Sequence, residues 1–254
     1  MVTGGASGIG LGIAEALAAE GARVVLCDWK EGWLRRETER LGDAVIGQHF
    51  DVRDREGWQT AKRAAEDAFG PVEILVNNAG VVPGQFELAD TPVEHFDRLI
   101  GIMLVGMFNG IHTFAAGMRE RGDGHIVNTA SMAGLVTSPR LGAYTTAKFA
   151  VVGMSEVLRA EMEPHGVGVS VLCPGLVRTN LGIEDEQGQP TQDRPEMEGG
   201  MDPALVGARV LEAIRNNELH VLTHGGYEER LAARADRVRR AAEVAAKWQQ
   251  ESAK

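Results

Sequence analysis

The chain contains few cysteines, few aromatic residues and no excess of positive charge. Its 254 residues include only two cysteines, Cys27 and Cys173, and aromatic side chains make up 5% of them. Both cysteines lie in apolar runs, so we expect reduced, buried thiols and exclude a disulfide framework or a thiolate metal site. The seven histidines are scattered along the chain. Their spacing predicts no metal site.

Acidic residues outnumber basic ones by 36 to 26, which gives a formal net charge of −10. An acidic surface repels phosphate groups, so we expect no nucleic acid and no anionic membrane as a partner. No run of about 18 apolar residues is present. The first five residues, Met1-Val2-Thr3-Gly4-Gly5, lack the charged start and apolar core of a secretion signal. The sequence therefore predicts a soluble, cytoplasmic protein.

Short apolar runs alternate with amphipathic segments along the whole chain. Strands are predicted at residues 23–26, 44–50, 72–76, 125–128, 167–173 and 219–223. Their near-continuous apolar character is typical of strands covered on both faces. The clearest helical pattern lies between Phe96 and Phe114, where apolar residues recur at spacings of three and four. The alternation predicts an α/β fold, a doubly wound parallel sheet with helices on both faces, and the absence of a linker favours a single domain over residues 1–254.

Three segments lie outside this alternation of strands and helices. Residues 182–202 are polar and are predicted to form a lid, whereas residues 228–250 are predicted to form a C-terminal helix with an apolar stripe from Leu231 to Trp248. This stripe and the one between Phe96 and Phe114 exceed what one sheet face needs, so we expect a homodimer or homotetramer. Only Met1-Val2-Thr3 precede the first glycine turn, fewer than the roughly five residues of a central strand, which indicates a truncated or misassigned start.

A glycine-rich turn, Thr3-Gly4-Gly5-Ala6-Ser7-Gly8-Ile9-Gly10, leads from the first predicted strand into a helical pattern. Glycine lets the backbone approach phosphate groups, and the free amides of a helix start favour negative charge, so the turn is a candidate pyrophosphate site. Its candidate binding residues are Gly4, Ser7, Gly8, Ile9 and Gly10. The strict G-x-G-x-x-G pattern is not met, because Ile13 stands in place of the last glycine, and an ordinary glycine turn is the alternative.

Asp28 strengthens the cofactor interpretation. It lies eighteen residues after Gly10, at the end of the second predicted strand, near the offset of a carboxylate that binds a ribose 2′-hydroxyl. Such a carboxylate repels the 2′-phosphate of NADP, so NAD is the predicted cofactor, although the cations of Lys30 and Arg23 are close in sequence. Asp51 and Val52 end the third strand and are placed to meet the adenine.

Four motifs in order resemble those of the short-chain dehydrogenase/reductase family, from Thr3 through Leu181. They are Thr3-Gly4-x-x-x-Gly8-x-Gly10, Asn77-Asn78-Ala79-Gly80, Ser131 with Tyr144-x-x-x-Lys148, and Pro174-Gly175 with Thr179. The resemblance implies a Rossmann-type fold and a nicotinamide cofactor. It further implies that the cofactor is bound by Asn78, Ala79, Gly80, Tyr144, Lys148, Pro174, Gly175, Val177 and Thr179.

Tyr144 and Lys148 are four residues apart in a helical pattern, so their side chains share a face. A phenol beside an ammonium ionises more easily, which suits Tyr144 to acid–base catalysis. The resemblance assigns the catalytic roles: Ser131 holds the substrate oxygen, Tyr144 transfers its proton, and Lys148 also binds the nicotinamide ribose. It also reveals a departure, because Met103 stands where family members usually carry an active-site Asn that supports a water beside the lysine.

The predicted function is hydride transfer between NAD and a small-molecule substrate, a medium-sized, mostly apolar or aromatic secondary alcohol or its ketone. The candidate pocket wall is mostly apolar and comprises Met132, Thr137, Ser138, Leu141, Leu176, Leu181, Met197 and Met201. One alternative is an NADPH-dependent carbonyl reductase. A second alternative, from another class, is an NAD-binding sensor or scaffold protein with little turnover.

Overall fold

A parallel sheet forms the centre of the molecule in the computed structural model, which describes residues 1–180 and 199–253. Within these residues seven strands lie in the order β3-β2-β1-β4-β5-β6-β7, and every pairing is parallel. The strands are β1 (Val2–Thr3), β2 (Val24–Asp28), β3 (Val45–His49), β4 (Ile74–Asn77), β5 (Gly124–Thr129), β6 (Val167–Cys173) and β7 (His220–Leu222). The predicted single-domain, doubly wound sheet is thereby confirmed. Six of the seven strands are predicted from the sequence, and their ends differ from the prediction by no more than two residues.

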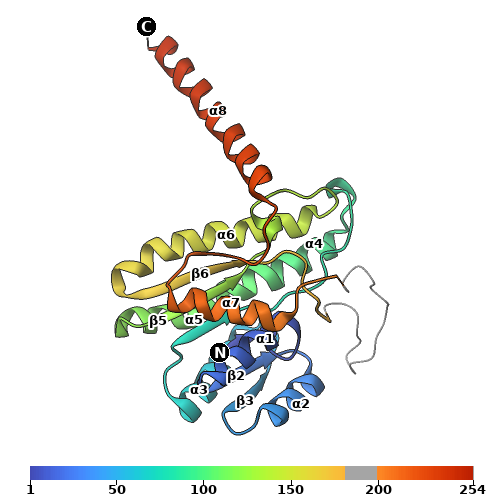
Figure 1. Cartoon of the computed structure of the whole chain (residues 1–254), viewed down its shortest axis with the longest axis vertical. Helices are drawn as coiled ribbons and strands as arrows, with labels where there is room; N and C mark the ends of the chain where they lie inside the picture. The colour runs from blue at the N-terminus through green and yellow to red at the C-terminus, as the bar shows by residue number, and fades with distance from the viewer. Residues whose placement is uncertain (181–198, 254) are drawn as a thin grey trace.

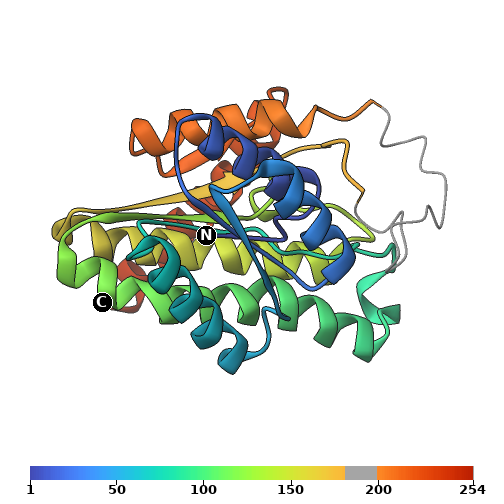
Figure 2. The same cartoon turned by 90° about the horizontal axis from the view of Figure 1, so that it is seen from below.

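Helices cover both faces of the sheet (Figures 1 and 2). One face carries α1 (Gly8–Ala19), α2 (Glu31–Leu41) and α7 (Pro203–Arg215), and the other carries α3 (Arg55–Phe69), α4 (Val93–Ile100), α5 (Gly106–Arg121) and α6 (Gly142–Met162). Successive strand residues point to opposite faces. In β2, Val24 and Leu26 therefore join the core under α1, α2 and α7, whereas Val25 and Cys27 join the core under α3, α5 and α6. This double burial explains why the strands are apolar throughout.

Helices α4 and α5 are joined without a break by a π-helical turn, η2 (Gly101–Val105), so that the three form one helical stretch. Residues Val93–Arg121 are long and apolar enough, by length and composition, to cross a membrane. Half of the most apolar window is buried inside the protein, and the stretch packs against α3, α6, β4 and β5. Such burial is typical of the core helix of a globular domain. A π-helical turn inserts one residue into the helix and often marks a functional site.

The C-terminal helix α8 (Glu228–Ser252) projects away from the rest of the domain (Figure 1). None of its residues is buried, and Val238, Val244 and Trp248 are each more than half exposed. The predicted apolar stripe thus has no cover within the part of the chain that the structure describes. Most of the predicted lid, residues 182–198, lies outside the described residues, while Met201 at its end forms a β-bridge with Val177.

Helices α1 and α7 cross at two glycines. A Cβ on Gly207 would lie 2.1 Å from the carbonyl oxygen of Gly12, and a Cβ on Gly12 would lie 2.4 Å from the carbonyl oxygen of Pro203. Both distances are far below contact distance, so only glycine permits this approach. The crossing places the start of α7 beside the helix that follows the glycine turn.

We predict that Gly207→Ala lowers the free energy of unfolding by roughly 1–3 kcal/mol, because the methyl group forces the two backbones apart. The matched control is Gly153→Ala in α6, where a Cβ meets no atom within 4 Å. That change should raise stability by up to about 1 kcal/mol through helix propensity. Thermal and denaturant unfolding of both variants measure the difference, and equal midpoints would contradict the packing argument.

Candidate active site

The carboxyl ends of the strands form one side of a cavity of about 810 Å³. It lies where the strand order reverses between β1 and β4, the usual ligand position in open α/β sheets. Almost every predicted site residue lines it: Gly4, Ser7, Gly8, Ile9, Asp28, Asp51, Val52, Asn78, Ala79, Gly80, Ser131, Tyr144, Lys148, Pro174, Gly175, Val177 and Thr179. Segments distant in sequence therefore converge on a single cavity.

Gly10 is the exception among the predicted residues, because it does not line the cavity. A Cβ at Gly10 would lie 2.1 Å from the carbonyl oxygen of Gly4, so glycine is needed there for the turn to close on itself. Gly4 and Gly8 have φ of +61° and +53°, a left-handed conformation that favours glycine. The turn leaves Ser7, which makes no helix-capping bond with its side chain, and the start of α1 facing the cavity. This arrangement fits a pyrophosphate.

Asp28 ends β2 with its carboxylate at the cavity. One oxygen accepts a hydrogen bond from the Ala6 amide and the other from the Lys30 amide, both at 3.1 Å. The residue is only 9% exposed, and burial raises the pKa of its carboxyl, with the backbone hydrogen bonds opposing that rise. A carboxylate has about four acceptor positions, so two bonds to the backbone leave room for ribose hydroxyl donors.

The two cations near Asp28 in sequence lie in different places. The Lys30 ammonium lies 3.8 Å from the centre of the Trp33 ring, and both residues line the cavity. Arg23 stacks on Phe69, 5.5 Å from the ring centre, and does not line it. Lys30 is therefore the only one of the two that reaches the ligand site.

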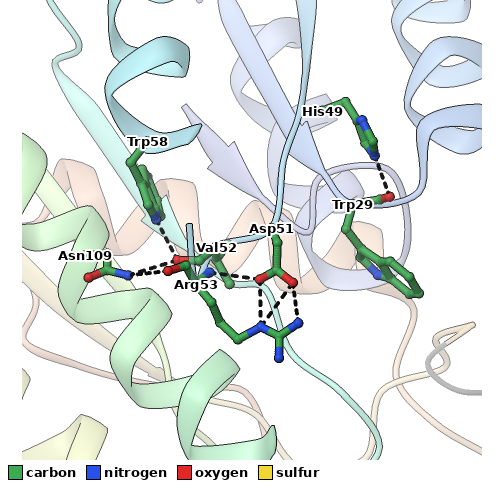
Figure 3. A network of polar contacts seen from close by, with 7 residues as sticks. All are labelled: Trp29, His49, Asp51, Val52, Arg53, Trp58 and Asn109. Carbon is green, nitrogen blue, oxygen red and sulfur yellow. Dashed lines mark hydrogen bonds and ion pairs between the residues drawn. The ribbon is translucent and has the colours of Figure 1, made fainter. Parts of the chain in front are cut away.

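The loop after β3 is fixed by a polar network (Figure 3). The Val52 carbonyl accepts hydrogen bonds from the Trp58 indole at 2.8 Å and the Asn109 amide at 3.2 Å. Asp51 accepts bonds from the Arg53 guanidinium, which holds the pKa of that carboxyl below its usual range. The sequence placed Asp51 at the adenine but gave no sign of its pairing with Arg53. Asn109 supports this loop through its bonds to the Val52 and Arg53 carbonyls.

Asn78 joins the ends of three central strands. Its side-chain amide donates to the Thr3 carbonyl at 3.1 Å, and its side-chain oxygen accepts from the Thr129 hydroxyl at 3.3 Å. Its backbone amide donates to the Thr3 hydroxyl at 2.9 Å. Asn78 thus has a structural role at the strand ends as well as a position on the cavity wall.

Ser131, Tyr144 and Lys148 come together at the end of β5 and the first turns of α6. Ser131 and Tyr144 both line the cavity, and the Lys148 ammonium lies 5.6 Å from the centre of the Tyr144 ring. The ammonium donates to the Thr129 carbonyl at 2.8 Å. A donor, a phenol and a cation therefore adjoin one another at the cavity, as acid–base chemistry requires.

The expected direction of the Tyr144 shift is not found in the protein alone. Burial raises the pKa of Tyr144, and the neighbouring Ser131 only partly opposes the rise. Burial also lowers the pKa of Lys148 to about 8. The sequence predicts that the neighbouring cation together with the bound cofactor favours the phenolate, and without the cofactor the loss of water around the phenol dominates.

Met103 lies in the π-helical turn and is 1% exposed. It packs with Leu99 and Ala147, and Tyr144 packs against the same cluster. A thioether is at most a weak acceptor. The position that usually carries an amide beside the catalytic groups is therefore apolar in this protein, and Met103 also lines the cavity.

The predicted substrate wall is only partly present. Met132, Ser138, Leu141 and Leu176 line the cavity, whereas Thr137 and Met201 do not, and Leu181 and Met197 lie outside the described residues. Sequence reasoning missed Tyr227 and Arg230, which line it from the beginning of α8. The Arg230 guanidinium donates to the Thr137 carbonyl at 2.8 Å. No local motif marks these two residues.

A family model described as short chain dehydrogenase matches residues 1–190. The chain belongs to the short-chain dehydrogenase family. Among its relatives, "3-alpha-(or 20-beta)-hydroxysteroid dehydrogenase" of Mycobacterium tuberculosis is 37% identical over 182 residues, which cover 71% of this chain and 69% of that protein. "Probable oxidoreductase EphD" of the same species is 37% identical over 203 residues, 78% of this chain. The match covers only 34% of EphD, so the chain spans about a third of that relative.

A solved structure supports the same assignment. The short-chain dehydrogenase/reductase from Burkholderia phymatum, in complex with NAD, is 32% identical with a TM-score of 0.84, and the match covers 94% of this chain and 92% of that one. The chain is therefore a member of a family of oxidoreductases that bind a nicotinamide cofactor. The glycine turn, Asp28 and the strand-end cavity of this short-chain dehydrogenase fit such a cofactor.

We predict that Met103→Asn raises kcat more than it changes KM, because a restored amide would support a water that exchanges protons with Lys148. The buried amide should also lower stability by roughly 1–3 kcal/mol. Met107→Asn is the matched control, since Met107 is equally buried on the same helical stretch but belongs to the core that does not include Tyr144. Steady-state rates across pH are the measurement. An unchanged kcat and pH profile in a folded Met103→Asn protein would show that the residue at this position does not affect proton exchange with Lys148.

Proposed function

We propose that the protein transfers a hydride between NAD and a medium-sized, mostly apolar or aromatic secondary alcohol or its ketone. The observation that carries this proposal is the convergence of Ser131, Tyr144 and the Lys148 ammonium on the same cavity as the glycine turn and Asp28. A bound nicotinamide ring would supply the hydride acceptor or donor. The side chains of the protein would then manage the substrate oxygen and its proton.

Each of the three side chains has a separate task in this mechanism. Ser131 donates a hydrogen bond to the substrate oxygen and orients it toward Tyr144. Tyr144 takes the hydroxyl proton during oxidation of the alcohol and returns it during reduction of the ketone. Lys148 favours the phenolate by its charge and binds the nicotinamide ribose hydroxyls.

The pKa that Tyr144 needs for catalysis indicates how much free energy cofactor binding must contribute. Work near neutral pH requires the Tyr144 pKa to fall by roughly 3 units from about 10, or about 4 kcal/mol in favour of the phenolate. Burial acts in the opposite direction in the protein alone. Lys148 supplies part of the fall, and we infer that charge and hydrogen bonds that accompany the cofactor supply the rest, so that the proton-transfer site is complete only in the loaded enzyme.

NAD is favoured over NADP because the Asp28 carboxylate stands where the ribose 2′ position is expected. A phosphate placed there would meet a negative charge in a partly buried site. The presence of Lys30 at the cavity supports the alternative, an NADPH-dependent carbonyl reductase. The sensor or scaffold alternative rests on Met103, which stands in place of the active-site Asn that family members usually carry. A panel of secondary alcohols with either cofactor separates all three, because a sensor binds NAD without turnover.

The substrate class follows from the cavity wall and from a relative. Met132, Val136, Leu141 and Leu176 present apolar surface near the catalytic groups. The related hydroxysteroid dehydrogenase is named for a large apolar secondary alcohol. Both observations favour an apolar or aromatic substrate over a phosphorylated sugar.

We further propose a cytoplasmic homodimer or homotetramer. Phe108 on α5, Val157 on α6 and Trp248 on α8 are large apolar side chains with 47%, 58% and 69% exposure. We expect an assembly of subunits to cover these exposed side chains. Light scattering at micromolar concentration should give a multiple of the 27.3 kDa chain mass, and the mass of a single chain would refute the proposal.

We predict a kcat/KM for NAD about a hundredfold above that for NADP. Each factor of ten corresponds to about 1.4 kcal/mol, and a repelled phosphate at Asp28 accounts for about two such factors. Asp28→Asn keeps the shape of the side chain and removes its charge, so it should reduce the difference between the kcat/KM values for NAD and NADP. Equal values for both cofactors in the wild-type protein would overturn the assignment.

We predict that Tyr144→Phe lowers kcat by at least about a hundredfold, the typical loss when a general acid–base group is removed. The ring remains, so the protein should fold and bind NADH as before. Steady-state rates, NADH fluorescence titration and thermal unfolding provide the three readouts. Activity near that of the wild type in a folded, NADH-binding variant would exclude this role for Tyr144.

A further inference from the structure

His224 lies just after β7 and contacts the loop that follows β6. Its Nδ1 atom is 3.1 Å from the Gly175 amide nitrogen, and its Nε2 atom is 3.0 Å from the Leu176 carbonyl oxygen. The Thr223 hydroxyl lies 2.7 Å from Nδ1. Gly175 and Leu176 line the cavity, and His224 does not. One imidazole thus fixes two consecutive residues of the cavity wall from behind.

The two loop contacts determine the tautomer of the ring. The Gly175 amide can only donate, so Nδ1 must accept. The Leu176 carbonyl can only accept, so Nε2 must carry the proton and donate it. His224 is therefore a neutral imidazole protonated on Nε2. A side chain that makes both contacts needs an acceptor for the Gly175 amide and a donor for the Leu176 carbonyl.

The ring also packs flat on Gly175. A Cβ on Gly175 would lie 2.7 Å from Cγ of His224 and 2.9 Å from its Nδ1 atom, so this contact requires glycine. The same loop reaches the catalytic serine, because the Pro174 carbonyl accepts bonds from the Met132 amide at 2.9 Å and the Ser131 hydroxyl at 3.4 Å. The loop is thus held by Ser131 and Met132 on one side and by His224 on the other.

We propose that His224 is a positioning residue that holds the Pro174–Leu176 backbone in the shape that receives the nicotinamide end of the cofactor. This inference rests on the proposed function: hydride transfer beside Ser131 and Tyr144 requires the nicotinamide ring at that end of the cavity, where the Pro174 carbonyl contacts the Ser131 hydroxyl. The adenine end lies at Asp28 and Asp51, which His224 does not contact. Loss of His224 should therefore weaken binding of the nicotinamide half and leave the adenine half unaffected.

The test compares two ligands that differ only by the nicotinamide group, NADH and ADP-ribose, by titration calorimetry. His224→Leu removes the acceptor and the donor, and we expect NADH affinity to fall about tenfold, the equivalent of about 1.4 kcal/mol, with ADP-ribose affinity unchanged. His224→Asn keeps an acceptor toward Gly175 and lacks the ring donor to Leu176, so its NADH affinity should lie between those of the leucine variant and the wild type.

His220→Leu is the matched control, because His220 lies on β7 and its described partner is the exposed Glu156. Both affinities should stay unchanged in that variant. An equal loss of NADH and ADP-ribose affinity in His224→Leu, or no loss of either, overturns the inference. If the leucine variant does not fold, the asparagine variant decides, since a wild-type ratio of the two affinities overturns it as well. A wild-type protein that binds neither ligand refutes the proposed function itself, which is a distinguishable result.

Discussion

The buried ammonium of Lys148 is the constraint on which the site depends. Lys148 is 3% exposed, and among the described residues its hydrogen bond runs to the Thr129 carbonyl. A buried charge with so little compensation is costly, as the fall of its pKa to about 8 indicates. The contact ties α6 to the end of β5. It therefore fixes Tyr144 one helical turn away and brings it to Ser131.

The sheet edge supplies the remaining geometry. Parallel strands end at one edge, so the glycine turn, Asp28, the Asp51 loop, Asn78 and the Pro174 loop meet there although they are far apart in sequence. The central strand β1 has only two residues. Its end is nevertheless well fixed, because the Thr3 hydroxyl accepts bonds from the amides of Asn78 and Ala79. Short polar contacts thus compensate for a short strand.

Sequence reasoning predicted the fold and Asp28 from local patterns, whereas most of the other site residues came from the resemblance to a known family. Apolar runs and helical spacing define the elements, and in a parallel sheet the residues at strand ends must converge, which places Asp28, Ser131 and Pro174 together. Contacts between distant segments carry no such signal. The Asp51–Arg53 pair, the support of Gly175 by His224 and the position of Arg230 at the cavity all depend on loop shapes that spacing does not determine.

The direction of the Tyr144 shift was also beyond the sequence, because burial depends on the whole packed environment. The spacing of Tyr144 and Lys148 shows that the two groups are neighbours, but not how much water surrounds them. The same holds for Met103, whose departure from the family pattern is visible in the sequence. Only its contacts with Leu99 and Ala147 show that its nearest neighbours in that cluster are apolar.

The central claim is that Tyr144 becomes a proton-transfer group only when the cofactor is bound. The chain has two tyrosines, Tyr144 and Tyr227, so in a Tyr227→Phe protein the tyrosinate absorbance near 295 nm reports Tyr144 alone. We predict a titration midpoint above the ordinary value of about 10 without cofactor, because burial raises the pKa. Saturating NAD, with its positively charged ring, should move the midpoint to lower pH. A midpoint that NAD leaves unchanged would contradict the account.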